Sequence, residues 1–242
     1  MYYYILEPPS SRSVRQIHQR LRDLLTNLGI AGEIVMASPA RPAEELTAIG
    51  VNRGYSTIVA VGADNFINKI AVGLIEKAVL GIVPIGASAE IEELVGASGI
   101  KEAAEALKYR RLSDCPTVIV APDTHLFISG VIESPKLAKV SLVLDNRVKA
   151  FAYFNRIVVN RGLEIKIEST HQTKSRRILG LFSVGGELVR SESSFHARSL
   201  RLVTDPELPM KVAGETIAVS PIQMRLHPQS LKVITRRGTL DR

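Results

Sequence analysis

Cysteine, tryptophan and paired metal ligands are scarce in this sequence, and their scarcity excludes several classes of protein. The one cysteine, Cys115, can form no disulfide within the chain, so we expect a reducing, cytoplasmic setting. None of the five histidines has metal-ligand spacing to Cys115 or to another histidine, which argues against a zinc site. With no tryptophan and no recognisable nucleic-acid motif, binding of DNA or RNA has little support.

Long hydrophobic runs and a secretion signal are also missing. The most apolar stretch, residues 70–89, contains Glu76, Lys77 and Pro84, so we predict no transmembrane segment. The opening MYYYILEPPSSR lacks the basic and apolar regions of a signal peptide. A chain of 242 residues, 45% of them hydrophobic, is long enough to bury one large core or two smaller ones.

Positive charge exceeds negative charge in this chain. The formal net charge of +7 favours anionic partners, such as nucleotides, lipids or the headgroups of the inner membrane surface. Three arginine pairs, at residues 110–111, 176–177 and 236–237, are candidates for contact with headgroups. A solvated basic surface explains the same charges, because they are spread along the whole chain. A homo-oligomer is compatible with the sequence and not required by it.

The first half of the chain alternates apolar runs with amphipathic stretches. We predict strands at residues 2–6, 33–37, 57–61 and 80–85, and helices at residues 13–28, 42–53, 66–78, 89–95 and 100–109. The run TIVAV has no polar alternation, as expected for a strand buried on both faces of a parallel sheet. This βα rhythm predicts an α/β fold with a doubly wound parallel sheet, whose ligands bind outside the carboxyl ends of the strands.

The pattern of apolar residues changes after Cys115. Short stretches such as HLFISGVIE and KVSLVLD follow with few helical periods between them, which predicts an all-β, sandwich-like or bent-sheet domain. We therefore expect an α/β domain of nucleotide-binding type at residues 1–114 and a β-rich lipid or substrate domain at residues 115–242. Residues 231–242 are candidates for packing back on the first domain.

One turn has the right position for phosphate binding. GADNFIN, residues 62–68, follows a buried strand and opens a helix, where backbone N–H groups and the helix dipole can meet an anion. A phosphate cradle usually has several glycines that let the backbone approach closely, and Gly62 is the single one in this segment. The pattern fits either a phosphate loop or an ordinary strand-to-helix turn. Phe66 fits a core position on the helix better than a nucleotide contact.

Three segments in this order resemble the diacylglycerol kinase catalytic-domain family of lipid kinases, which is related to the NAD kinases. They are GADNFINKIAVGL, LGIVPIGASAE and LPMKVAGETIAVSPIQMRLHPQSLKVIT. The family patterns read GGDGTINEVANGL, LGIIPLGTGNDFA and a DGEP turn followed by SPIEIEVLPGALRVLVP. The resemblance implies an α/β nucleotide domain followed by a β-rich domain, with ATP and lipid meeting in the cleft between them.

The motifs match the family in part. Identical or chemically similar residues stand at Gly62, Asp64, Ile67, Asn68, Gly86, Glu90, Gly214 and Glu215. Family residues are replaced at Ala63, Asn65, Phe66, Lys69, Ala87, Ser88, Ala89 and Ala213. The opening EPPSS stands where the family has an NPxSG turn and matches it at Pro8 and Ser10. Ala213 replaces an Asp that the family uses to activate the acceptor hydroxyl, and alanine cannot remove a proton.

The resemblance also implies roles for individual residues. Nucleotide contacts are implied at Gly62, Ala63, Asp64, Asn65, Asn68, Gly86, Ser88 and Ser10. Catalytic roles are implied for Asp64 and Glu215, and ligation of Mg²⁺ for Glu215 and Glu90. By chemistry alone, Asp64 is equally a helix N-cap and Glu215 equally a solvated turn acid.

Two functional hypotheses follow. The first is an ATP- and Mg²⁺-dependent lipid kinase that transfers the γ-phosphoryl group to a lipid hydroxyl. The second is a non-catalytic relative that keeps the scaffold as a ligand-binding or interaction module, because parts of every motif are replaced. A kinase of the NAD type would share the first motif and leave the ending SPIQMRLHPQSLKVIT unexplained.

Overall fold

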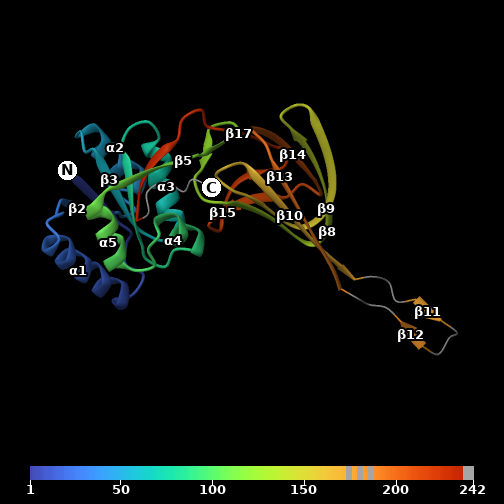
Figure 1. Cartoon of the computed structure of the whole chain (residues 1–242), viewed down its shortest axis with the longest axis horizontal. Helices are drawn as coiled ribbons and strands as arrows, with labels where there is room; N and C mark the ends of the chain where they lie inside the picture. The colour runs from blue at the N-terminus through green and yellow to red at the C-terminus, as the bar shows by residue number, and fades with distance from the viewer. Residues whose placement is uncertain (173–175, 179–181, 185–187, 237–242) are drawn as a thin grey trace. The chain divides into compact units, whose positions relative to one another are not determined.

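The computed structural model describes residues 1–172, 176–178, 182–184 and 188–236 (Figure 1). The chain forms two compact units. Unit 1 consists of residues 1–117 together with the C-terminal residues from His227, and unit 2 consists of Val118–Leu226. Unit 2 is therefore an insertion in the sequence of unit 1.

Unit 1 contains a six-stranded sheet in the order β2-β1-β3-β4-β18-β5. Its strands are β1 (Tyr2–Leu6), β2 (Glu33–Met36), β3 (Thr57–Gly62), β4 (Val79–Pro84), β5 (Arg111–Cys115) and β18 (Leu231–Thr235). Neighbours are parallel except for β18 and β5, which are antiparallel. Every residue of β3 is buried, as its all-apolar sequence predicts for a strand covered on both faces.

Five helices accompany this sheet. They are α1 (Arg12–Asn27), α2 (Ala43–Asn52), α3 (Asp64–Leu74), α4 (Ala89–Val95) and α5 (Ile100–Tyr109). Helix α1 packs against α5, and α2 packs against α3. The connections from β1 to β2 and from β2 to β3 run in opposite directions across the sheet, so right-handed crossovers place α1 and α2 on opposite faces. The predicted doubly wound α/β fold is confirmed.

Two of the three tyrosine hydroxyls in the central strand β1 have backbone acceptors, whereas the buried hydroxyl of Tyr3 has no hydrogen-bond partner among the described residues. The Tyr4 hydroxyl donates to the carbonyl of Ile30 at 2.6 Å, and the Tyr2 hydroxyl donates to the carbonyl of Leu107 at 2.7 Å. Burial raises the pKa of the Tyr4 hydroxyl, which therefore stays protonated as a donor. Tyr2 and Tyr4 thus fit a buried strand because their hydroxyls reach backbone acceptors.

Helix α3 differs from its prediction at both ends. It begins at Asp64 rather than Phe66 and ends at Leu74 rather than residue 78. The early end has a local cause, because Glu76 adopts a φ of 65° and the N–H of Lys77 donates to the carbonyl of Leu74 in a tight turn. The apolar period continues past Leu74 in the sequence, but the backbone leaves the helix there.

Unit 2 is built on a ten-stranded antiparallel sheet. Its path is β13-β10-β9-β8-β14-β17-β6-β7, with β15 paired to β8 and β16 to β15. The strands are β6 (Val118–Val120), β7 (Thr124–Leu126), β8 (Gly130–Leu144), β9 (Val148–Val159), β10 (Glu164–Gln172), β13 (Leu188–His196), β14 (Ser199–Asp205), β15 (Pro209–Val212), β16 (Glu215–Val219) and β17 (Ile222–Leu226). A separate two-stranded sheet joins β11 (Arg176–Ile178) and β12 (Phe182–Val184). The predicted β-rich second part is confirmed.

One strand of unit 2 is longer than predicted. The stretches HLFISGVIE and KVSLVLD read as separate strands, but Gly130–Glu133 of the first and Lys139–Leu144 of the second lie together in β8, which spans 15 residues. The pairing of β8 with β9 shifts register between Glu133 and Ala138. An irregularity of this kind bends a long strand without ending it, so the sequence breaks its alternation while the hydrogen-bonded strand continues.

No helix in the described part of the chain is long and apolar enough to cross a lipid bilayer.

A two-residue hairpin turn joins β15 to β16. Val212 pairs with Glu215, and the two residues between them have positive φ angles, 47° at Ala213 and 87° at Gly214. Such turns favour Asn or Asp before Gly, because an L side chain at positive φ is otherwise strained. Ala213 is therefore a poor residue for its backbone conformation.

We expect Ala213→Asn to stabilise the protein, since asparagine adopts this conformation at lower cost. If the substitution removes about 1 kcal/mol of backbone strain from the folded state, the melting temperature should rise by roughly 2–4 °C. Ala213→Val should lower the melting temperature, because a β-branched side chain tolerates positive φ worse. Calorimetric scans of the three proteins test the prediction, and it is wrong if both substitutions shift the melting temperature in the same direction.

A second prediction concerns His18 in α1. The side chain is 4% exposed, and within the described residues neither ring nitrogen has a hydrogen-bond partner. Burial lowers the pKa of His18 below its ordinary 6.5, the positive charge of Arg22 lowers it further, and the negative charge of Glu7 opposes the shift. The folded protein therefore keeps this ring neutral at a pH where the unfolded chain has protonated it.

The stability contributed by neutral His18 is complete above pH 6.5 and is lost as the pH falls toward the lowered pKa of the folded state. We expect urea midpoints to fall between pH 7 and pH 5.5, and His18→Leu to remove part of that fall. His196→Asn is the control, because its side chain is 74% exposed. An unchanged pH dependence in His18→Leu would contradict the assignment.

Candidate functional site

The candidate site lies at the carboxyl ends of β1, β3 and β4 in unit 1. In the strand order β2-β1-β3 the chain direction across the sheet reverses between β1 and β3. Open α/β sheets bind ligands at such a reversal, just outside the strand ends. The residues that follow these strands are Glu7 after β1, Ala63 after β3, and the segment of residues 85–88 after β4.

The Glu7 carboxylate occupies the turn between β3 and α3. The N–H of Ala63 donates to Oε2 of Glu7 at 2.8 Å. The N–H of Glu7 in turn donates to the carbonyl of Val61 at 2.9 Å, which extends the pairing of β1 with β3 by one residue. Ala63 is the N-cap of α3 and has no side-chain oxygen of its own. A carboxylate from the neighbouring strand end therefore binds a backbone donor that an incoming phosphate would need.

Gly62 makes room for this carboxylate. A Cβ atom at position 62 would lie 2.5 Å from Oε2 of Glu7 and 2.8 Å from Cβ of Glu7. It would also lie 3.1 Å from a ring carbon of Phe66. The space that glycine provides beside the backbone is thus filled by a side chain of the same unit. Phe66 is 7% exposed and is a core residue of α3, as its position in the helical period indicates.

Asp64 connects two turns of the site. Its Oδ1 accepts from the N–H of Ser88 at 2.8 Å, which ties the first turn of α3 to the start of α4. The carbonyl of Gly62 accepts from the N–H of Ile85 at 3.0 Å, so the backbone makes a second link between the same segments. The structure therefore brings together Gly62, Ala63, Asp64 and Ser88. Asp64 acts here as a structural bridge between loops.

The remaining predicted nucleotide contacts are arranged around this group. Asn65 and Asn68 lie in the first two turns of α3, and Asn68 is 9% exposed. Gly86 has a φ of 70° with open space where a Cβ would lie, so it shapes the turn after β4. Ser10 is exposed and precedes Ser11, the N-cap of α1. Among the described residues, Ser10 takes no part in the hydrogen bonds that join the turns after β3 and β4.

The two predicted metal ligands fall in different units. Glu90 lies in the first turn of α4 in unit 1, and Glu215 begins β16 in unit 2. Across the described residues, no three side chains of His, Cys, Asp or Glu cluster in a way that could hold a metal ion.

The arginine pairs also have individual environments. Arg110 ends α5 and donates to the hydroxyl of Thr57 at 3.3 Å. Arg236 pairs with Glu102 at 3.6 Å. The side chains of Arg176 and Arg177, and the whole of Arg237, lie outside the described residues. Arg110 and Arg236 therefore already have partners within unit 1.

The Glu7 side chain takes up the donor and the space that this turn offers. The N–H of Ala63 already has an anionic acceptor, and the space above Gly62 holds the Glu7 side chain. A phosphate at the same place would meet a carboxylate of like charge. The motif comparison assigned no role to Glu7. The signal was present in the sequence, as an acid at the position where the NPxSG turn has asparagine.

Comparison with known proteins agrees with this architecture. Residues 2–117 match the family described as the diacylglycerol kinase catalytic domain. Comparison with curated protein sequences gives no match.

Solved structures resemble the chain over nearly all of its length. A diacylglycerol kinase from Bacillus anthracis has a TM-score of 0.72 and 13% identity, with 97% of this chain and 96% of that chain covered. An NAD kinase from Archaeoglobus fulgidus in complex with ATP has a TM-score of 0.53 and 15% identity, with 98% and 94% covered. Yeast NADH kinase complexed with NADH has a TM-score of 0.58 and 11% identity, with 100% and 84% covered.

At these identities the structural likeness concerns the fold, and the family match rests on residues 2–117. The parallel sheet, the order of the motifs and the antiparallel second unit all agree with it. Residues 2–117 of this chain thus match the diacylglycerol kinase catalytic-domain family, and the chain has the fold found in the diacylglycerol kinase and NAD kinase structures.

Proposed function

We propose that this chain is a non-catalytic relative of the diacylglycerol kinases, in which the nucleotide site is occupied by the protein's own carboxylate and the scaffold serves as a ligand-binding or interaction module. The observation that carries the proposal is the hydrogen bond of 2.8 Å from the Ala63 N–H to Glu7. It supports a turn that is closed to phosphate while Glu7 remains in place.

Charge repulsion explains why a carboxylate at this position would weaken the binding of a nucleotide phosphate. Two like unit charges 4 Å apart repel by about 4 kcal/mol at an effective dielectric of 20, which corresponds to roughly three powers of ten in affinity. Phosphoryl transfer needs the opposite arrangement, with donors and cations that neutralise the phosphates. The carboxylate of Glu7 removes one donor and adds a negative charge, so both effects weaken nucleotide binding.

The hairpin turn in unit 2 supports the same proposal. The family's Asp is replaced there by Ala213, which offers no proton acceptor. The positive φ of 47° favours Asp or Asn at this position, so the backbone has kept the conformation while the carboxylate has been lost. The loss therefore affects the chemistry of the turn and leaves its shape intact.

A lipid kinase that transfers the γ-phosphoryl group of ATP to a lipid hydroxyl is the second candidate. The observation in its favour is that Gly62, Asp64 and Asn68 keep the family residues around the turn. Rotation of the Glu7 side chain away from Ala63 would free the N–H for phosphate. Under this hypothesis the carboxylate acts as a gate that opens when nucleotide and Mg²⁺ arrive.

Removal of the Glu7 charge distinguishes the two candidates. We expect the unmodified protein to bind MgATP at least tenfold more weakly than Glu7→Gln or Glu7→Asn, because both variants remove the repulsion. Isothermal titration calorimetry measures the affinities, and Glu44→Gln, an exposed acid in α2, is the matched control. Equal affinities for the unmodified protein and Glu7→Gln would contradict the proposal.

Transfer itself is tested with radiolabelled ATP and a panel of lipid alcohols. We expect no transfer by the unmodified protein. In the Glu7→Asn background, Ala213→Asp adds the missing carboxylate, whereas Ala213→Asn suits the same turn without supplying one. Transfer with Asp alone would identify a degraded kinase, and transfer by the unmodified protein would establish the second candidate.

A further inference from the structure

The sheet of unit 2 has one buried face and one exposed face. Along β14, Leu200, Leu202 and Thr204 are buried, and the residues between them are exposed or half-buried. The same alternation holds in β8 beyond Ala138 and in β17. Side chains alternate between the two faces of a strand, so the exposed residues of these neighbouring strands lie on one surface. We call it the outer face.

Large apolar side chains gather on the outer face. Phe151 is 78% exposed and Tyr153 is 56% exposed, although both are aromatic residues in the middle of a regular strand. With Val203 of β14 they line a hollow of about 420 Å³. The strand register places Phe151 opposite Ser141 and Ser141 opposite Val203, so these residues form one row across β9, β8 and β14. Exposed apolar surface of this kind usually marks an interaction site.

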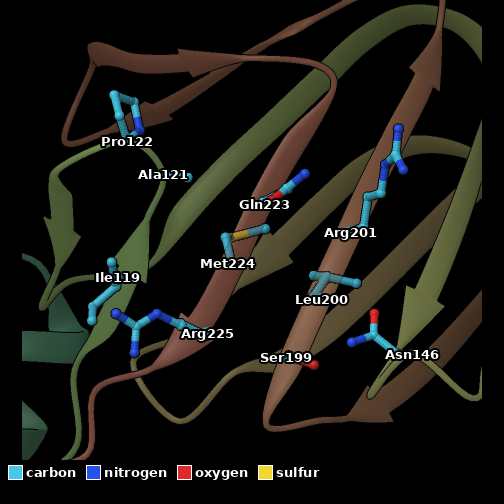
Figure 2. A pocket seen from close by; sticks show the side chains of 10 residues that line it. All are labelled: Ile119, Ala121, Pro122, Asn146, Ser199, Leu200, Arg201, Gln223, Met224 and Arg225. Carbon is cyan, nitrogen blue, oxygen red and sulfur yellow. The ribbon is translucent and has the colours of Figure 1, made fainter.

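Basic side chains lie beside this row. Arg201 and Arg225 line a second hollow of about 350 Å³ together with Gln223 and Asn146, and Figure 2 shows the two guanidinium groups coming from neighbouring strands. Arg201 is two residues from Val203 along β14, a rise of about 7 Å, so the basic hollow adjoins the apolar one. Neither arginine has an ion pair within the part of the chain that the structure describes.

Further cations frame the apolar row. Lys149 lies opposite Val143 on β8, and Val143 lies opposite Arg201. Lys139 lies opposite Tyr153 on one side and Asp205 on the other. Around this row the face therefore carries the cations Lys139, Lys149, Arg201 and Arg225 and the carboxylate of Asp205. Farther along the same face, Arg156 is paired with Glu133 and Glu168.

We propose that the outer face of unit 2 binds a membrane surface rich in anionic phospholipids. The four cations meet lipid phosphates, and the rings of Phe151 and Tyr153 enter the interfacial region, where aromatic side chains are favoured. A bilayer offers both parts of this pattern, because its charged headgroups lie directly above apolar chains. The inference goes beyond the proposed function and holds whether or not unit 1 binds nucleotide.

The chemistry of the face disfavours other occupants. A second copy of the chain bound symmetrically through this face would bring the same cations together, which repel. A single-stranded nucleic acid would also satisfy the cations. The apolar hollow, however, exposes more apolar than polar surface at Phe151, Tyr153 and Val203, which suits hydrocarbon better than the polar edges of bases.

Vesicle binding tests the proposal. We expect the full chain to sediment with vesicles of phosphatidylcholine mixed with phosphatidylglycerol, to leave vesicles of pure phosphatidylcholine unbound, and to dissociate as salt is added. Arg201→Gln/Arg225→Gln should weaken binding by roughly tenfold or more. Arg12→Gln/Arg15→Gln, which removes two exposed arginines from α1, is the matched control and should bind as the unmodified protein does.

A fluorescent reporter gives an independent readout, because the chain has no tryptophan. The single tryptophan of Phe151→Trp should shift its emission to shorter wavelength on anionic vesicles. Tyr109→Trp should not shift, although Tyr109 is 71% exposed. Both substitutions are at exposed positions, and circular dichroism checks that each variant is folded.

The proposal is overturned if the protein does not bind anionic vesicles, or if the α1 control loses as much binding as Arg201→Gln/Arg225→Gln. It is also overturned if Phe151→Trp binds vesicles without a shift in its emission. Tighter binding to an RNA or DNA oligonucleotide than to anionic vesicles would overturn it as well. Light scattering adds a further test, since a dimer that dissociates in Phe151→Ser would make this face an interface between two copies.

Discussion

The bond between the Ala63 N–H and the Glu7 carboxylate lies where the order of the parallel sheet reverses, and it links the fold to the chemistry of the site. At a strand-to-helix turn the first backbone donors have no partners within the helix, so something must accept from them. In a phosphate-binding turn that acceptor is the ligand. Here it is a side chain from the adjacent strand end, held 2.8 Å away, and Gly62 leaves the space for it.

Two other features of unit 1 depend on the same turn. Asp64 bridges to the N–H of Ser88, and Gly62 accepts from Ile85, so the turns after β3 and β4 form one connected group. His18 lies on helix α1, where burial lowers its pKa and the charge of Glu7 opposes that shift.

Most of the architecture was predictable because it depends on the period of apolar residues. Thr57–Gly62 is buried on both faces, as its apolar sequence predicts. Ser199–Asp205 alternates apolar and polar residues and has one buried and one exposed face. The predictions were wrong where a local irregularity of the backbone decided where an element ends. Glu76 ends α3 early through a positive φ, and the register shift near Ala138 bends β8 without ending it. Neither the φ angle of Glu76 nor the register shift in β8 can be predicted from the spacing of apolar residues.

The sequence alone determined the order of strands and helices, the position of the phosphate-type turn, and the replacement of its glycines and of the hairpin aspartate, because these are properties of local pattern and residue type. Only the tertiary structure decided what occupies that turn. Glu7 and Ala63 are far apart in the chain and meet because β1 and β3 are parallel neighbours. The same reason applies to the outer face of unit 2, where aromatic and basic residues from four separate strands become one surface through the register of antiparallel pairing.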